Sequence, residues 1–198
     1  YVAPESRFEK KDKHQLRDAS YHLILLAQNE TGYKNLLNLV TAGYLEGFYY
    51  KPRIDKELLA EHAEGLIALS SCGRGELADN VNKENIPRAM ETADQYRDIM
   101  GQGNFFLELQ YHNMDYQEKV NKEIIKIAEK LSLPLVATNN CHYLERKDFR
   151  AHEILLCLQT GKTISDQYRM RYPSDEYYFK SPEEMMQIFR EVPEAIEN

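Results

Sequence analysis

The chain has 198 residues, of which 42% are hydrophobic and 29% are charged, and its formal net charge is −7. This size and composition are typical of one globular domain with a sizeable core, and they argue against disorder. A net acidic chain is a poor match for a surface that binds nucleic acid by bulk electrostatics, so any contact with DNA would be local or would belong to other sequence.

The cysteine content and hydropathy indicate the cellular compartment of such a domain. Cys72, Cys141 and Cys157 form an odd set without CxxC spacing, which is typical of a reducing cytosol. No apolar run approaches the roughly 18 residues of a membrane span, and no charged-then-apolar leader opens the chain. We therefore expect a soluble cytoplasmic domain. Because "YVAP" resembles the end of a strand and no initiator methionine precedes it, we also expect a fragment.

Predicted strands and helices alternate along the chain. Apolar runs predict strands over 21–28, 66–71, 104–112 and 133–140. Helical spacing predicts helices over 30–40, over 56–65 with Gly65 closing the helix, over 76–100 and over 116–131. This order predicts an α/β fold in which a mainly parallel sheet or barrel is covered by helices.

The tail predicts a last helix. Ser181 suits the N-cap position, Pro182 suits the first helical position, and acidic residues occupy the first turn. We therefore divide the chain into a domain over 1–180 and a helix over 181–198 that docks on it or bridges to another part of a larger protein.

Polar and metal-capable side chains follow the predicted strands. They are Gln28 and Asn29, Ser71 and Cys72, Gln110 and His112, and Asn140, Cys141 and His142. Ligands bind at the carboxyl ends of parallel strands, so these residues mark the edge where a site is expected. A thiol with imidazoles suits zinc or a similar ion. Buried free cysteine is also a common core residue, and the residues alone favour that plainer interpretation.

Other interpretations of these residues stay open. Cys72 before a glycine could be a nucleophile with His142 as its base. The turn "SSCGRGE" lacks the GxxxxGK[ST] pattern of a phosphate loop, so Gly73 and Gly75 are expected to supply unusual dihedral angles in a strand-to-helix turn. The loop "YYKPRID" could stack on bases, although a solvated turn is the favoured interpretation.

The remaining cysteine and histidines are expected to have structural or surface positions. Cys157 lies at helical spacing with Ile154 and Leu158 and is predicted to be a core residue. His14, His62 and His152 are predicted to be exposed or capping residues without a role in the site. His22 lies at the start of its predicted strand, and spacing alone does not place it with the other polar residues.

Five stretches, taken in order, resemble the PHP domains of bacterial DNA polymerase III alpha subunits, which are C-family replicative polymerases. They are "ETGYKNLLNLVTAGYLEGFYYKPRID", "GLIALSSC", "NFFLELQYH", "VATNNCHYL" and "AHEILLCLQTGK". The resemblance extends over essentially the whole chain, and the order of several motifs makes it specific. It implies a distorted (β/α)7 barrel of the PHP type, with helices outside a mainly parallel barrel sheet, and a cluster of divalent metal ions (zinc, manganese or magnesium) at its mouth.

The resemblance also implies the metal ligands. The family's "HLxLLA" histidine falls on His22, its "LSxC" cysteine on Cys72, and its "TNDxHY" aspartate and histidine on Asn140 and His142. Asn140 departs from the family because an amide brings no negative charge, so metal affinity is expected to fall. The family's HxHT motif, its aspartate-histidine pair and a glutamate should precede residue 1, so we expect a partial barrel without its first strands and more than half of its ligands.

The implied function is that of one part of a replicative DNA polymerase, which carries out template-directed nucleotidyl transfer. This segment would be a metal-binding scaffold or a remnant 3′-5′ exonuclease, and its catalytic residues are not assigned. Implied partners are DNA through the parent polymerase and replisome subunits such as a proofreading exonuclease and a sliding clamp. Two alternatives remain: a free-standing metal-dependent PHP phosphoesterase that acts on small phosphates, and a purely structural domain that binds no metal.

Overall fold

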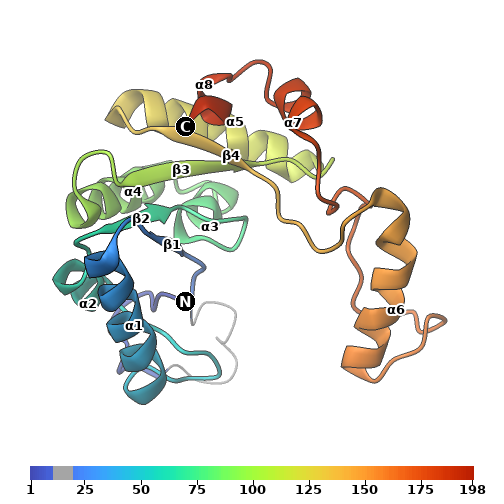
Figure 1. Cartoon of the computed structure of the whole chain (residues 1–198), viewed down its shortest axis with the longest axis horizontal. Helices are drawn as coiled ribbons and strands as arrows, with labels where there is room; N and C mark the ends of the chain where they lie inside the picture. Colours follow the sequence, from blue (N-terminus) through green and yellow to red (C-terminus); the bar gives the residue numbers. More distant parts are fainter. Residues whose placement is uncertain (11–19) are drawn as a thin grey trace.

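The structure, a computed structural model, describes residues 1–10 and 20–198, so the predicted surface position of His14 lies outside the described residues. A four-stranded sheet lies at its centre (Figure 1). Its strands, in spatial order, are β1 (Ile24–Ala27), β2 (Leu66–Leu69), β3 (Phe105–Gln110) and β4 (Leu135–Thr138). The predicted mixed α/β class with a mainly parallel sheet is confirmed, because β2, β3 and β4 are parallel neighbours.

Strand β1 runs antiparallel to β2, and this reverses which of its ends faces the carboxyl edge of the sheet. Ile24 pairs with Leu69, so the beginning of β1 lies beside the end of β2. At the other end, the Gln28 side-chain amide lies 3.4 Å from the side-chain oxygen of Asn104, a residue that precedes β3. The expectation that Gln28 and Asn29 join the polar edge was therefore wrong, and residues just before β1 take their place.

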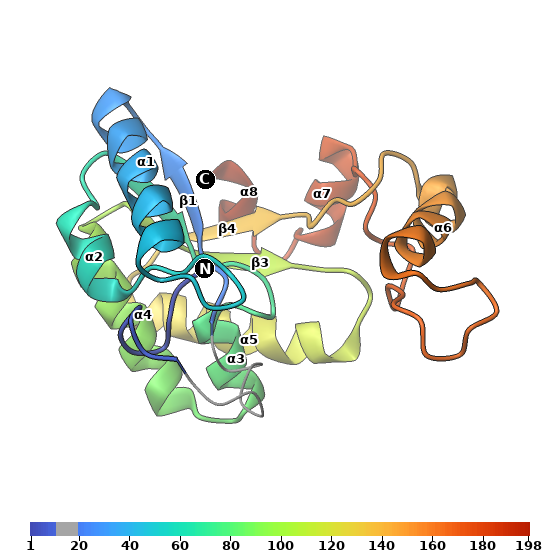
Figure 2. The same cartoon turned by 90° about the horizontal axis from the view of Figure 1, so that it is seen from below.

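Helices cover the sheet on both sides (Figure 2). Helices α3 (Glu76–Asn82), α4 (Ile86–Met100) and α5 (Asp115–Leu131) lie on one side, and α1 (Glu30–Leu45) lies on the other. In α5, Val120, Ile124 and Ile127 are buried at the spacing of one helical face, as the sequence predicts. Short α2 (Lys56–Glu61) ends before Gly65, whose φ of 73° suits glycine and turns the chain into β2.

The helix predicted over 76–100 is divided into α3 and α4. Between them Glu84 adopts a φ of 59°, and the Asn85 side chain accepts a hydrogen bond from the Arg88 amide as the N-cap of α4. Pro87 lies in the first turn of α4, where its missing N–H costs nothing but where it cannot continue a preceding helix. A cap and a proline therefore outweigh the continuous helical pattern.

The last third of the chain forms a separate arm and then returns to the sheet (Figures 1 and 2). The short 3-10 helix η2 (Arg146–Asp148) leads into α6 (Phe149–Thr160), which stands away from the sheet. Helices α7 (Pro182–Ile188) and α8 (Glu194–Glu197) follow. Ser181 caps α7 as predicted, but Pro193 precedes a second helix, so the tail holds two helices where one was expected over 181–198. The division at residue 180 stays a prediction.

The core lies between the strands and the helices that cover them. Leu107 and Leu109 of β3 and Ala68 of β2 are fully buried against α4 and α5 residues. Within the part of the chain that the structure describes, no helix is long and apolar enough to cross a membrane.

Candidate functional site

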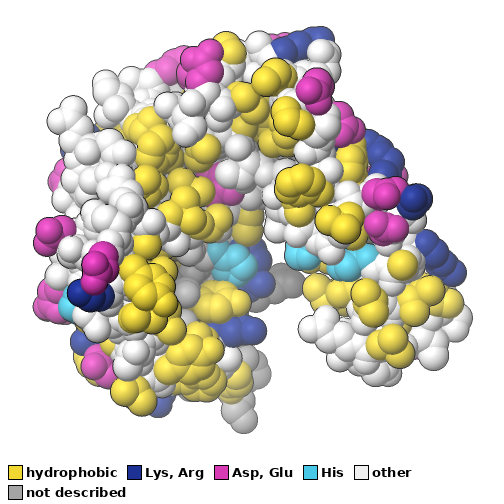
Figure 3. Space-filling model, in the orientation of Figure 1, with side chains coloured by type: hydrophobic (Ala, Val, Ile, Leu, Met, Phe, Trp, Pro, Cys, Tyr) yellow, Lys and Arg dark blue, Asp and Glu magenta, His cyan; other side chains and the backbone are white. Residues whose placement is uncertain are grey.

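A cleft of about 620 Å³ lies at the carboxyl edge of the sheet, beside the segment that returns from α6. All four residues that the resemblance marked as metal ligands line it, namely His22, Cys72, Asn140 and His142. In the space-filling view, histidine side chains lie on both sides of the hollow between the sheet and the α6 arm (Figure 3). The fold therefore brings residues from distant parts of the sequence to one cavity.

His22 and Cys72 form the closest pair of these residues. The Nδ1 atom of His22 lies 3.7 Å from the Sγ atom of Cys72. The contact exists because β1 is antiparallel: His22, just before β1, donates its backbone N–H to the carbonyl of Arg74 in the turn after β2, at 3.0 Å. The imidazole beside Cys72 is therefore His22, whereas the nucleophile hypothesis assigned that position to His142.

The turn that carries Cys72 departs from the sequence prediction in one detail. Neither Gly73 nor Gly75 has a positive φ, and the left-handed residue is Ser71, with a φ of 69°. Gly75 is required for space instead, because a Cβ there would lie 2.2 Å from the carbonyl oxygen of Ser70. The Gly75 amide also donates to the carbonyl of Cys72 at 2.7 Å, which fixes the thiol at the sheet edge.

His22 has the properties of a free metal ligand. Its Nε2 atom is buried and has no hydrogen-bond partner. Burial lowers the pKa of His22, and the positive charge of Arg74 lowers it further. The ring is therefore neutral near pH 7, which is the form of histidine that binds metals.

His142 lies in a cluster of aromatic rings on the other wall of the cleft. Its Nε2 atom lies 2.9 Å from the hydroxyl of Tyr172, and its ring centroid lies 5.7 Å from that of His152. Partial burial lowers the pKa of His142, and His152 lowers it further. His152 is half-buried, and its Nδ1 atom has no hydrogen-bond partner, so the expected exposed position was wrong, whereas the expectation that it has no role in the site stays a prediction. No spacing in the sequence connects residues 142 and 152.

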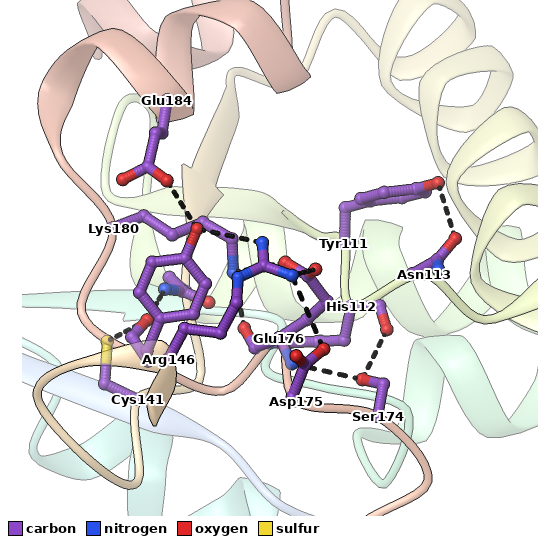
Figure 4. Close-up of polar contacts among 12 residues, drawn as sticks. Tyr111, His112, Asn113, Cys141, Arg146, Ser174, Asp175, Glu176, Lys180 and Glu184 are labelled. Atoms are coloured by element: carbon purple, nitrogen blue, oxygen red, sulfur yellow. Dashed lines mark hydrogen bonds and ion pairs between the residues drawn. The ribbon is translucent and has the colours of Figure 1, made fainter. Parts of the chain in front are cut away.

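The segment that follows α6 holds this wall of the cleft in place (Figure 4). The Arg146 guanidinium contacts Glu176 at 2.7 Å and the Tyr178 hydroxyl at 3.2 Å. Nearby, the His142 amide donates to the carbonyl of Tyr177 at 2.8 Å. The Ser174 hydroxyl donates to the carbonyl of His112 at 2.7 Å. The arm is thereby tied to both β3 and β4 at the cleft.

His112, two residues after β3, is a further histidine at the expected edge, although the resemblance does not mark it as a metal ligand. It is 1% exposed, and its ring stacks on that of Tyr177 with the centroids 4.2 Å apart. Gln117 contacts both its backbone and its ring, while the Nε2 atom has no partner. Burial lowers the pKa of His112 to about 4, with a smaller contribution from the charge of Lys180.

The charges of the cleft are unusual for a metal centre. None of its described lining residues is aspartate or glutamate, whereas Arg74 and Arg171 lie exposed at its rim. Neither arginine forms an ion pair with a described carboxylate. Among the described residues, no three His, Cys, Asp or Glu side chains are grouped closely enough to hold a metal ion. The nitrogen and sulfur donors fit a borderline-soft cation, but they form an incomplete set.

A buried carboxylate contacts Gln110, a residue that lines the cleft. Glu108 of β3 is 2% exposed; one of its oxygens accepts from the Gln110 amide at 2.7 Å and from the Thr138 hydroxyl, and the other has no partner. Gln110 lines the cleft itself, so this network links the core of the sheet to the site. In the sequence Glu108 is simply one residue of an apolar strand, which gives no signal of this position.

Other predicted positions can be compared with the structure. Cys157 is buried in α6, as predicted, and His62 is the C-cap of α2. Arg53 of the "YYKPRID" loop is 1% exposed, and its guanidinium donates to backbone carbonyls of Gly47, Arg7 and Glu9. Tyr50 and Lys51 are exposed, as expected of a solvated turn, but Arg53 is buried and organises the loop, so its side chain is not available to contact a nucleic acid.

Comparison with known proteins gives two findings. The sequence profile of the PHP domain matches residues 2–112, which include His22, Cys72 and His112 but not Asn140 or His142. Proteins named DNA polymerase III subunit alpha match the chain over its whole length: that of Treponema pallidum is 48% identical over 198 residues, and that of Borreliella burgdorferi is 43% identical over 198 residues. That of Thermus aquaticus is 46% identical over 195 residues. The chain covers only 16–17% of the length of these three relatives.

Proposed function

This chain belongs to the PHP domain family, and from that premise we propose that it serves as the PHP domain of a bacterial replicative DNA polymerase of the polymerase III alpha type. The identity of 37–48% to proteins of that name, extending over the whole chain, carries this proposal. The parent protein would carry out template-directed nucleotidyl transfer in the cytoplasm. It would bind DNA, a proofreading exonuclease and a sliding clamp, while this segment alone would not extend a primer.

The finer fold proposal is a partial (β/α)7 barrel. It is supported by the parallel ladder of β2, β3 and β4 and by the helices that cover the strands. The antiparallel β1 would be one of the distortions of such a barrel.

The site is proposed to hold a divalent metal ion weakly or for a structural purpose. His22 and Cys72 would supply a nitrogen and a sulfur ligand, His142 a second nitrogen, and Asn140 an uncharged oxygen. This donor set favours zinc over magnesium, which prefers oxygen ligands, and manganese is intermediate. When bound, a divalent ion would polarise a phosphoryl oxygen and lower the pKa of a water molecule.

The chain's own residues have separate roles in this proposal. The neutral rings of His22 and His142 present unprotonated nitrogen atoms, because burial lowers the pKa of both residues. Arg74 and Arg171 at the rim attract an anionic phosphoester. Asn140 is the residue that limits the site, since it lacks the negative charge that would balance a cation.

The test is metal analysis by equilibrium dialysis against zinc and manganese, together with an assay for release of nucleotides from the 3′ end of DNA. We expect weak zinc binding in the unaltered chain, and Asn140→Asp should raise zinc affinity about tenfold or more. His62→Ala, which alters a helix-capping histidine outside the cleft, is the matched control for His142→Ala. Tight occupancy by several metal ions, with exonuclease activity that His142→Ala abolishes, would contradict the weakened site.

A free-standing phosphoesterase that acts on small phosphates is the second proposed function. The volume of the cleft, about 620 Å³, favours it because this is the size of sites that hold small molecules. The flanking coding sequence discriminates between the two functions: a reading frame that ends soon after residue 198 supports the phosphoesterase, and a long one with paired aspartates supports the polymerase.

A further inference from the structure

His112 is a buried side chain of the cleft, and its neighbours determine whether its free ring nitrogen donates or accepts a hydrogen bond. His112 lines the cleft, is 1% exposed, and carries an Nε2 atom without a hydrogen-bond partner. An unpaired polar atom in such a position costs free energy unless a ligand or water satisfies it. The resemblance assigns His112 no role in metal binding.

Gln117 determines which nitrogen of His112 carries the proton. The backbone N–H of His112 donates to the Gln117 side-chain oxygen at 2.7 Å. A backbone N–H is only a donor, so the oxygen of the Gln117 amide must face it, and the NH₂ group must face the ring. That NH₂ group lies 2.9 Å from Nδ1 of His112. Nδ1 therefore accepts, and in the neutral ring the proton resides on Nε2.

This tautomer has a chemical consequence. An Nε2 atom that carries a proton has no lone pair for a metal ion, but it is a good hydrogen-bond donor. Stacking on Tyr177 and the hydrogen bond from Ser174 to the His112 carbonyl hold the residue in place. A rigid, buried N–H donor is the kind of group that stabilises a negatively charged oxygen.

We propose that His112 is an oxyanion donor whose Nε2–H, together with the guanidinium groups of Arg74 and Arg171, binds a phosphoryl oxygen in the cleft. The two arginines line the same cavity without carboxylate partners among the described residues, and no described acidic side chain lines the cavity to repel an anion. Identifying the anion as the phosphoryl group of a phosphoester rests on the proposed function.

Asn139 offers a competing acceptor within the protein. Its Oδ1 atom is also buried and, like His112 Nε2, has no partner at hydrogen-bond geometry, but hydrogen bonding to the Asn139 side chain raises the pKa of His112 against the effect of burial. Its NH₂ group is already committed to the carbonyl of Tyr178. If the His112 proton served only to pair with Asn139, removal of the imidazole would leave phosphate binding unchanged.

The first experiment observes the tautomer directly. Two-bond ¹H–¹⁵N correlation spectra of the chain labelled with ¹⁵N-histidine distinguish rings protonated on Nδ1 from rings protonated on Nε2. We expect His112 to be protonated on Nε2 both without metal and with saturating zinc. An Nδ1-protonated ring, or loss of the Nε2 proton on addition of zinc, would overturn the proposal.

The second experiment measures binding of inorganic phosphate to the same chain by NMR titration near pH 8, where the ring is neutral. His112→Phe keeps an aromatic ring on Tyr177 but removes the donor, and phosphate should bind about tenfold more weakly. Gln117→Glu keeps the shape of the contact but places an acceptor opposite Nδ1, which moves the proton to Nδ1. This variant should bind phosphate more weakly and zinc more tightly.

Asn82→Asp is the matched control for the added charge, because Asn82 lines the cleft and has no hydrogen bond to His112. It should leave the His112 tautomer unchanged and weaken phosphate binding less than Gln117→Glu does. Equal effects of the two variants, or phosphate binding that His112→Phe leaves unchanged, would overturn the proposal.

The two proposals fail in different ways. If neither metal binding nor hydrolysis is found, while His112 is protonated on Nε2 and phosphate binds as expected, the proposed function is refuted and the anion site is supported. If His112 proves to be a zinc ligand in a hydrolytic domain, the oxyanion role is refuted and the proposed function is supported.

Discussion

Tyr172→Phe should increase the affinity of the cleft for zinc. The Tyr172 hydroxyl lies 2.9 Å from Nε2 of His142, and when Nε2 carries no proton, as metal binding requires, it accepts the hydroxyl proton. That hydrogen bond must break before the same nitrogen binds a metal. Phenylalanine removes this competition and keeps the ring contacts with His142, His152 and Tyr177, whose centroids lie 4.5, 5.2 and 4.5 Å from that of Tyr172.

The size of the effect follows from the net value of one hydrogen bond. A neutral hydrogen bond contributes about 0.5–1.5 kcal/mol after exchange with water, which corresponds to roughly a 2- to 10-fold change in affinity. The hydroxyl is in a partly exposed position, so the lower half of that range is expected. An increase in zinc affinity distinguishes loss of this hydrogen bond from damage to the cleft, because disruption of the aromatic cluster would lower zinc affinity.

The assay is isothermal titration of the chain with zinc near pH 8, where His142 is neutral. Tyr168→Phe is the control, since Tyr168 is 94% exposed and makes the same chemical change away from the cleft. If Tyr172→Phe binds zinc no better than Tyr168→Phe, His142 does not bind the metal through this nitrogen and the proposed ligand set is wrong.

Three further changes test the site and its support. Cys72→Ser should weaken zinc binding at least tenfold in the same titration, whereas Cys141→Ser, at an exposed residue that does not line the cleft, should leave it unchanged. Gly75→Ala should destabilise the fold by about 1–3 kcal/mol in urea denaturation, because its Cβ would meet the Ser70 carbonyl at 2.2 Å, whereas Gly73→Ala meets nothing closer than 3.4 Å and should change stability little. Folding lowers the pKa of His112 from 6.5 to about 4, so as pH falls the unfolded chain binds a proton before the folded chain does. The stability that depends on a neutral His112 is therefore complete above pH 6.5 and is lost as pH falls toward 4. That loss is at most about 3 kcal/mol, and about 1–2 kcal/mol with solvent screening, and denaturation at several pH values should show a flatter profile in His112→Phe.

The strands and most helices could be predicted because their signals are local. Apolar runs placed all four strands, which are four to six residues long, and Ser181 with Pro182 placed the start of α7. The break between α3 and α4 was missed although its signals, Asn85 and Pro87, are also local, because the helical pattern on either side was given more weight. Patterns that compete within one segment are therefore the weak point of such predictions.

The direction of β1 could not be predicted from the sequence. The connection from β1 to β2 contains two helices, a length that suits a parallel crossover as well as an antiparallel return. Only the packed structure decides between them, and the decision moves His22 into the cleft and Gln28 out of it. The resemblance names His22 from its motif and does not need the strand direction; the structure places the residue in the cleft, and its role as a metal ligand stays a prediction.

The remaining site residues were hidden because their roles depend on tertiary contacts. His152 meets His142 through the arm that α6 forms, and Glu108 acquires its partners only when β3 and β4 pair. His112 was visible as a polar residue at a strand end, but its donor role needs the orientation of the Gln117 amide, which is set by a backbone N–H five residues earlier in the chain. A sequence pattern carries no such orientation.

The charge balance of the cleft determines what these residues can bind together. Two rim arginines and a fixed N–H donor favour an anion, whereas the His22 and Cys72 pair favours a cation. A phosphoester bridging a metal ion and the arginines would satisfy both groups, because its oxygens can ligate the ion and accept hydrogen bonds at once. Without a carboxylate at residue 140, however, the cation has little negative charge to hold it before the anion arrives. The cleft is therefore expected to bind metal and phosphate cooperatively, each ligand supplying the charge that the protein side chains do not.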